Sequence, residues 1–310
     1  MDSVFNLKKF SSNTNKKNFK RKNNLMKNNK IILFGTGGGP RLEKGLSWPT
    51  SSVIEIDNHP YVVDCGLGVT RQFVEHDYTL SQLNNIFLTH LHSDHVLELG
   101  GLVHTAWTTG VSKNISIYGP KGTQNLKDGM LMSFKVDIET RIADEKQRDL
   151  ESIINVHEIS EGLVMEDERV KVSALQVVHP PLEHCYALKF ETQNSKVVFS
   201  GDTTFFPPLI EFSKNADVLI HEVMLEKGID DLVERLKEVK PNLREHLVNS
   251  HTYAGDVGKI AEKANVKHLT LNHFVPKDKE DYPAQDFIDS VSKNYKGKIT
   301  VGYDGCKILF

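Results

Sequence analysis

The chain has 310 residues, of which 39% are hydrophobic and 25% are charged, and its formal net charge is −3. These values are ordinary for a globular protein, and the length allows one large domain or two small ones. No apolar run reaches the ~18 residues that a membrane-spanning helix needs. The composition therefore excludes a helical membrane protein, and we expect a cytoplasmic protein without membrane contact.

Charge is distributed unevenly along the chain. Residues 1–30 contain nine Lys or Arg against Asp2 alone, so they carry +8 and the other 280 residues carry −11. Eight Asn fall in the same segment, which has few apolar residues. We predict a disordered, basic, Asn-rich N-terminal extension over 1–29. A passive tail, or Met26 as the true start, is favoured over contact with nucleic acid or an anionic surface, and over an organellar presequence.

The three cysteines, Cys65, Cys185 and Cys306, are an odd number without CxxC spacing. Neither a disulfide framework nor a thiolate metal site is indicated. Each cysteine follows or lies within an apolar stretch, so we predict buried thiols.

The first half of the chain alternates predicted strands and helices. A strand over 30–34 is broken by the glycine-rich segment 35–40, which lacks the P-loop lysine and the full dinucleotide-binding spacing. We interpret this segment as a tight turn that brings backbone near the functional site. The other predicted elements are a hairpin (52–57 with 61–64), a strand ending at 89, a helix over 96–109, a strand over 115–118, a helix over 123–134, a charged segment over 135–150 that forms a solvated helix or a lid, and a strand over 153–159.

The second half continues this pattern. Its predicted elements are strands over 170–178, 185–191, 196–199, 217–220 and 266–271 and helices over 208–215 and 253–264. Five predicted strands, ending at 89, 178, 199, 220 and 271, lead into His or Asp. Functional groups gathered at strand ends are typical of an α/β site.

The segment His90-Leu91-His92-Ser93-Asp94-His95 carries three imidazoles and a carboxylate in six positions. A single strand or helix cannot aim all four at one point, so the segment is predicted to be a loop. Nitrogen donors beside a carboxylate suit zinc or a similar divalent ion. His90 and His92 can face one ion while Asp94 and His95 face another, and ion pairs about 3.5–4 Å apart are common in hydrolytic sites.

Together with the isolated His179, Ser200-Gly201-Asp202-Thr203 and the late His273, this segment resembles the metallo-β-lactamase fold superfamily. Within it, the chain is similar to the branch that contains ribonuclease Z and the arylsulfatase-like hydrolases. The resemblance runs from about Ile31 to the C-terminus, so residues 30–310 are expected to form one hydrolase domain. Further matching segments are Gly35-Thr36-Gly37, Asp64-Cys65-Gly66, 118–122, 216–222 and His251-Thr252.

The resemblance implies an α/β fold, a four-layer αββα sandwich with a dinuclear metal site at one edge. It implies that His90, His92 and His179 hold the first ion, that Asp94, His95 and His273 hold the second, and that Asp202 bridges both. His184 is an alternative to His179, which is favoured because it directly follows a predicted strand. The expected ions are two Zn²⁺, with manganese or iron as alternatives.

In such a site a metal-bridged hydroxide attacks the substrate. The resemblance implies that Asp94 orients or deprotonates this water, and His251 is the candidate general acid. A surface histidine at a helix N-terminus is the alternative for His251. Glu222 is expected to hold the far nitrogen of a histidine, and His221 could equally be a buried structural residue. The histidines 76, 157, 246 and 268 receive no role.

Three functions are compatible with this site. The first is a hydrolase of a phosphodiester, sulfate ester or carboxylic ester in a small or medium-sized molecule. The second is a ribonuclease Z-like endoribonuclease that processes tRNA 3′ ends. It is disfavoured because the family's tRNA-binding arm is an insert between residues matching His179 and Asp202, which are only 23 positions apart here, and because the body is acidic. The third is a non-catalytic metal-binding scaffold, disfavoured because every expected ligand is present. A homodimer is left open.

Overall fold

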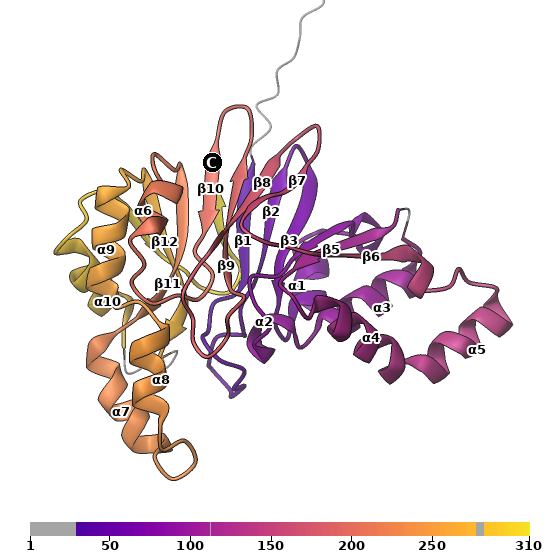
Figure 1. Cartoon of the computed structure of the whole chain (residues 1–310), viewed down its shortest axis with the longest axis horizontal. Coiled ribbons are helices and arrows are strands. Elements are labelled where there is room, and N and C mark those ends of the chain that lie inside the picture. Colours follow the sequence, from indigo (N-terminus) through magenta and orange to yellow (C-terminus); the bar gives the residue numbers. More distant parts are fainter. Residues whose placement is uncertain (1–28, 112, 277–281) are drawn as a thin grey trace, which may run out of the picture.

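Two seven-stranded β-sheets lie face to face at the centre of the protein, and helices cover their outer faces (Figure 1). The structure is a computed structural model and describes residues 29–111, 113–276 and 282–310. The predicted extension lies outside these residues except for Asn29, whose backbone carbonyl accepts a hydrogen bond from Phe310 N and whose side chain accepts one from Asp57 N. Asn29 is therefore hydrogen-bonded to the folded body, and the rest of the predicted extension lies outside the described residues.

The first sheet has the strand order β14-β1-β2-β3-β4-β5-β6. Its strands β14, β1, β2 and β3 pair antiparallel, and β3 to β6 pair parallel. The bounds are β1 (Lys30–Gly35), β2 (Ser51–Ile56), β3 (His59–Cys65), β4 (Asn85–Phe87), β5 (Ile115–Gly119), β6 (Ile154–Glu158) and β14 (Cys306–Leu309).

The second sheet has the order β13-β12-β11-β10-β9-β8-β7. Here β7 to β10 pair antiparallel and β10 to β13 pair parallel. The bounds are β7 (Gly162–Glu166), β8 (Lys171–Gln176), β9 (Tyr186–Glu191), β10 (Lys196–Phe199), β11 (Val218–Met224), β12 (His268–Val275) and β13 (Lys298–Val301).

The helices form the two outer layers. The first sheet is covered by α1 (Val69–Glu75), α3 (Leu99–Thr109), α4 (Thr123–Ser133) and α5 (Lys135–Glu145), and the second by α6 (Pro208–Phe212), α9 (Ala254–Lys263) and α10 (Ala284–Ser292). A hairpin of α7 (Glu226–Leu236) and α8 (Leu243–Ser250) projects beyond the sheets. The short helices are α2 (Ser93–Val96), η1 (Leu80–Gln82) and η2 (Glu151–Ile153).

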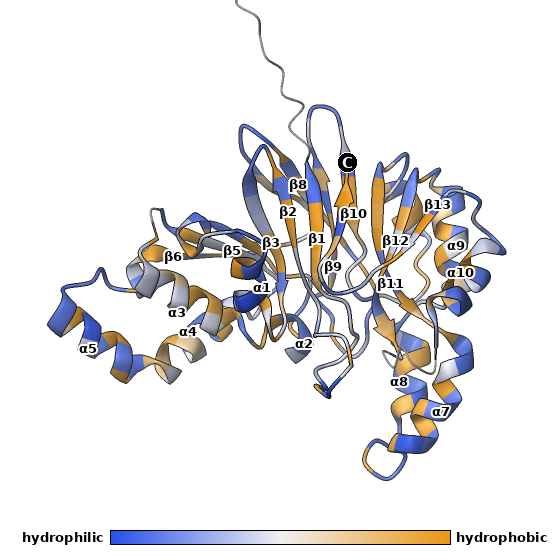
Figure 2. Cartoon of the chain, turned by 180° about the vertical axis from the view of Figure 1, so that it is seen from behind, coloured by the Kyte–Doolittle hydropathy of each residue, from blue (hydrophilic) through white to orange (hydrophobic). Residues whose placement is uncertain are grey.

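Three apolar cores separate the four layers, as strand β1 illustrates. Ile31 and Leu33 pack between the two sheets, whereas Ile32 and Phe34 face the helices on the first sheet. Alternate residues of a strand point to opposite faces, so a strand covered on both sides is apolar throughout. Figure 2 shows strands that are largely hydrophobic, whereas α5 is largely hydrophilic. The predicted αββα sandwich is confirmed.

Some predicted elements were wrong in extent. The helix expected over 96–109 is two helices, α2 and α3, because the chain turns at Leu97 and Glu98. The charged segment 135–150 forms helix α5, which ends at Glu145. Strands β11 and β12 continue four residues past the predicted ends at 220 and 271. Pattern alone did not reveal α1, α7, α8, α10, β7, β13 and β14.

The three cysteines are buried and free, as predicted. Burial raises the pKa of the Cys65 thiol well above its ordinary value, and burial is also the main reason that the pKa of Cys185 rises to about 12. Within the described residues, every helix is too short or too polar to cross a membrane.

Candidate metal centre

The His90–His95 segment joins the end of β4 to helix α2, at the edge where parallel strands of the first sheet end. Leu88 N still donates to Tyr118 O of the neighbouring strand, and the chain then leaves the sheet. His92 caps the N-terminus of α2, so Asp94 and His95 lie in the first turn of that helix. This loop-then-helix path is what lets four donors in six positions face a common region.

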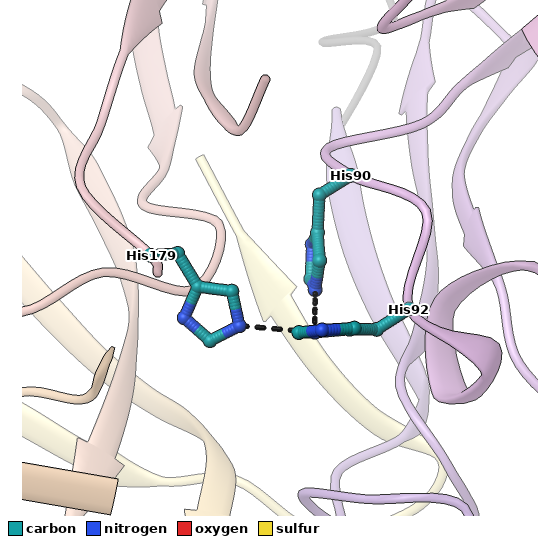
Figure 3. Close-up of side chains that lie close together, drawn as sticks. All are labelled: His90, His92 and His179. Carbon is teal, nitrogen blue, oxygen red and sulfur yellow. Dashed lines mark hydrogen bonds between the residues drawn. The ribbon is translucent and has the colours of Figure 1, made fainter. Parts of the chain in front are cut away.

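His90, His92 and His179 form a first group of ligand atoms (Figure 3). Nδ1 of His92 lies 3.1 Å from Nε2 of His90 and 3.0 Å from Nε2 of His179. His179 follows β8 in the other sheet, so the two halves of the sandwich meet at this group. His184, the alternative to His179, belongs to none of the ligand groups found in the described residues.

Asp94, His95 and His273 form a second group. Oδ2 of Asp94 lies 3.6 Å from Nε2 of His95 and 3.3 Å from Nε2 of His273. All three side chains are buried. His90 also groups with His95 and Asp202, and His251 groups with His179 and Asp202 and with Glu222 and His273, so the ligand groups overlap around Asp202. The assignment of the seven predicted ligands to two separate ions stays a prediction.

Asp202 lies between the two groups. Its Oδ2 is 3.7 Å from His90 Nε2 and 3.8 Å from His179 Nε2 in the first group. It is 3.4 Å from His95 Nε2 and 3.1 Å from His273 Nε2 in the second. A single oxygen within reach of both groups has the position of a bridging ligand.

The donors fit divalent ions. Nε2 of His95 is buried without a hydrogen-bond partner among the described residues, although it points toward two carboxylates. Burial lowers the pKa of His90 and His92, which keeps both imidazoles in the neutral form that binds metals. Burial opposes ionisation of Asp202, but His273, His95 and His90 outweigh it and hold its pKa well below its ordinary value. Burial also lowers the pKa of His95, but Asp202, Asp64 and Asp94 outweigh it and raise this pKa well above its ordinary value, so the carboxylates favour positive charge at that position. Imidazole nitrogens beside ionised carboxylates suit zinc or a similar ion.

Partners on the far side of the histidine rings fix which nitrogen faces the site. Asp64 Oδ2 lies 2.8 Å from His95 Nδ1, and Ser250 O lies 2.8 Å from His179 Nδ1. Both contacts require a proton on Nδ1, which leaves Nε2 free to bind a metal. From the sequence, Asp64 was recognisable only as part of a segment that matches the family. Its carboxylate also accepts bonds from Thr89, which ties the metal-binding loop to β3.

A β-bulge brings His273 into the site. Glu222 pairs with Asn272 and Val223 pairs with Phe274, so His273 is the extra residue, with a φ of 47°. Because a bulge re-aims a side chain without ending the strand, His273 points to the site while β12 continues. The expectation that ligands follow strand ends was therefore wrong for this residue.

The glycine-rich segment after β1 approaches the site, as predicted. Gly39 N donates a 2.7 Å hydrogen bond to Asp94 Oδ2. A Cβ at Gly38 would lie 2.9 Å from Phe274 O and 3.0 Å from the His273 ring, so a side chain there would displace backbone or a ligand. Glycine is needed here for close packing.

His251 and Glu222 form a buried pair beside the ligands. Both oxygens of Glu222 lie 3.2 Å from His251 Nδ1, which leaves Nε2 on the other side of the ring. Burial lowers the pKa of His251, but the Glu222 carboxylate outweighs it and raises the pKa to about 9. His251 is only 6% exposed, so the surface alternative was wrong, and the expected role of Glu222 in holding a histidine is confirmed. His221 is buried too, with Nε2 lacking a hydrogen-bond partner in the described chain.

A pocket of about 580 Å³ opens onto the metal centre. Helices α7 and α8 provide one apolar wall, and the glycine-rich segment provides another part of the lining. His246 of α8 also lines it, with its ring centre 6.4 Å from that of His92 and 6.2 Å from that of His179. No role was predicted for His246, because it does not follow a predicted strand. The sequence feature that could have pointed to His246 is its position one helical turn before Ser250, on the helix that leads into His251.

Comparison with known proteins agrees with this geometry. The profile of the family described as "Anti-Pycsar protein Apyc1" matches residues 29–275. A ribonuclease Z of Mycobacterium marinum is 30% identical over 250 residues, which are 79% of this chain and 86% of that protein. The metallo-β-lactamase fold protein YhfI of Bacillus subtilis superposes with a TM-score of 0.68 at 19% identity, covering 91% of this chain and all of YhfI. Human tRNase Z, short form, superposes with a TM-score of 0.64 at 21% identity, and the match covers 90% of this chain and 98% of the human protein.

The fold, the groups of ligand atoms and the similarity to known proteins together show that the chain is a metallo-β-lactamase-fold protein of the ribonuclease Z-like branch. Such proteins are metal-dependent hydrolases of ester bonds. Within that branch, the chain belongs to the anti-Pycsar protein Apyc1 family.

Proposed function

We propose that the protein hydrolyses phosphodiesters at a dinuclear metal centre, with His90, His92 and His179 on one ion, Asp94, His95 and His273 on the other, and Asp202 shared. The position of Asp202 carries this proposal, since one carboxylate oxygen lies 3.1–3.8 Å from nitrogens of both groups. The family relationship to ribonuclease Z supports the phosphodiester over the sulfate and carboxylic esters. Two zinc ions are the expected occupants, because imidazole and carboxylate donors suit zinc.

Divalent ions bound there lower the pKa of a coordinated water and neutralise charge on the scissile group. Asp94 orients the attacking water, and its own carboxylate is held by Gly39 N. His251 donates a proton from Nε2 to the leaving group, because its Nδ1 is held by Glu222. Thr203 N and Thr252 N both donate hydrogen bonds to the Glu222 carboxylate. Two segments of the chain therefore hold Glu222, which in turn orients the general acid His251.

The pocket favours a small or medium-sized substrate. Its volume of about 580 Å³ lies in the ordinary range for small-molecule sites. Between His179 and Asp202 the chain forms the hairpin of β9 and β10, whose connection spans residues 192–195. That interval therefore holds paired strands rather than an arm for a large nucleic acid.

A tRNA precursor is the second candidate substrate. The observation that favours it is the 30% identity to a curated ribonuclease Z over most of both chains. Against it stand the hairpin between His179 and Asp202 and the charge of −11 outside residues 1–30. A protein that grips many phosphates needs Lys and Arg and shows strong salt dependence.

One panel of assays tests the proposal. Metal-loaded protein is given bis(p-nitrophenyl) phosphate, an aryl sulfate, a carboxylic ester and a 3′-extended tRNA at equal enzyme concentration. We expect turnover of the phosphodiester, with weaker turnover of the other esters. Cleavage of the tRNA alone would establish the second candidate, and absence of all turnover with metal bound would favour the scaffold.

A further inference from the structure

Helix α8 carries His246 to the rim of the metal centre. Its ring centre lies 6.1 Å from that of His251, in addition to the two ligand rings already described. The side chain is partly buried and lines the pocket. It therefore faces the space that a substrate occupies, without belonging to a group of ligand atoms in the described residues.

Ser250 fixes the orientation of this ring. Its hydroxyl donates a 2.7 Å hydrogen bond to Pro180 O, so the proton of Ser250 Oγ is already used. His246 Nδ1 lies 3.3 Å from the same oxygen. Since Ser250 Oγ can then only accept from this ring, Nδ1 of His246 must carry the proton.

The protonation of Nδ1 determines what Nε2 can do. In a neutral imidazole one nitrogen donates and the other accepts, so Nε2 of His246 is an acceptor. No hydrogen-bond partner for this nitrogen is found among the described residues. An acceptor on the wall of a pocket calls for a donor on the ligand.

We propose that His246 contacts the substrate through Nε2 and selects phosphodiesters that carry a hydroxyl group beside the scissile phosphate. This inference rests on the proposed function for the identity of the phosphodiester. A hydroxyl on the carbon next to the one that bears the scissile oxygen, such as the 2′-hydroxyl of a ribonucleotide, supplies the required donor. A substrate without the hydroxyl loses this hydrogen bond, and water then pairs with Nε2 of the partly buried ring, so the expected discrimination is that of one hydrogen bond.

The test measures binding, so it does not depend on hydrolysis. Dissociation constants of adenosine 3′-monophosphate and its 2′-deoxy analogue are determined by calorimetry with zinc-loaded protein. The wild type is expected to prefer the hydroxyl-bearing ligand by about 10-fold, which one good hydrogen bond supplies. His246→Ala should bring the ratio close to one, and His246→Gln, which retains an acceptor oxygen, should restore part of it.

Asn249→Ala is the matched control, because Asn249 is exposed on the same helix and does not line the pocket. It should keep the wild-type ratio. A ratio of one in the wild type, or an unchanged ratio in His246→Ala, would overturn the inference. Failure of the proposed function is seen separately, as absence of turnover in the assay panel.

A second readout examines the tautomer directly. A long-range ¹H–¹⁵N spectrum of the metal-free protein distinguishes the protonated ring nitrogen from the one with a lone pair. We expect the proton of His246 on Nδ1, and Ser250→Ala should weaken this preference because the acceptor is removed. A proton on Nε2 in the wild type would contradict the inference.

Discussion

Asp202 Oδ2 lies 3.1 Å from Nε2 of His273, although Asp202 follows β10 and His273 lies within β12, with β11 between these strands. The contact spans two strand spacings because the bulge at His273 turns its ring toward the end of β10. The bulge and the Ser-Gly-Asp turn are thus both needed to join the two ligand groups.

His179→Ala should remove one ligand of the first group and reduce metal content. His184→Ala is the matched control five residues later, and it should retain wild-type metal content because His184 lies in no ligand group of the described chain. Both variants are measured by elemental analysis after dialysis against trace zinc. Greater metal loss in His184→Ala than in His179→Ala would reverse the assignment.

Asp64→Asn should weaken metal binding without removing a ligand. The amide can turn a donor toward His95 Nδ1, which favours the tautomer with the proton on Nε2, the nitrogen that faces the metal. Loss of such outer partners typically costs about 10- to 100-fold in metal affinity. A competition titration with a zinc chelator measures the change, and Asp128→Asn on the exposed face of α4 serves as control. Equal affinities for the two variants would refute the role of Asp64.

His251→Ala should preserve metal content but slow phosphodiester turnover by about 10²- to 10⁴-fold, the usual contribution of a general acid. The loss should be smaller for a substrate whose leaving group needs no proton, such as p-nitrophenolate, than for an alkyl leaving group. Steady-state kinetics with both substrates test this. An equal loss on both would argue against proton donation by His251.

Glu222→Gln should lower the pKa of His251 in the metal-free protein. Burial lowers this pKa, and the Glu222 carboxylate is the largest of the groups that raise it to about 9, so in the variant only the smaller effects of Asp202 and Asp94 oppose burial. Because the folded-state pKa is raised, the stabilisation by this pair is present below pH 6.5 and is lost as the pH rises through about 9. NMR titration of the His251 ring measures the shift. An unchanged pKa would show that Glu222 is not its cause.

Local pattern in the sequence was sufficient to predict an α/β protein with a metal-binding segment at His90–His95, whereas the αββα sandwich and the full ligand set were implied by the resemblance to the metallo-β-lactamase fold superfamily. The apolar strands and the His90–His95 spacing are visible in the sequence itself, and the structure brings the predicted ligands together in overlapping groups around Asp202.

The remaining features depend on contacts between distant segments. The bulge at His273 arises from pairing with β11, which no local pattern encodes. His246 reaches the pocket only because helix α8 packs beside His179 through Ser250. The same reason explains why Asp64 could not be recognised as the partner of His95 from spacing alone.

The number of bound ions tests the central claim most directly. Elemental analysis of the wild type should give two divalent ions per chain. Asp202→Ala, shown to be folded by circular dichroism, should lose this loading together with at least about 100-fold of its phosphodiester turnover. One ion per wild-type chain, or two ions and full turnover in Asp202→Ala, would contradict a dinuclear centre bridged by Asp202.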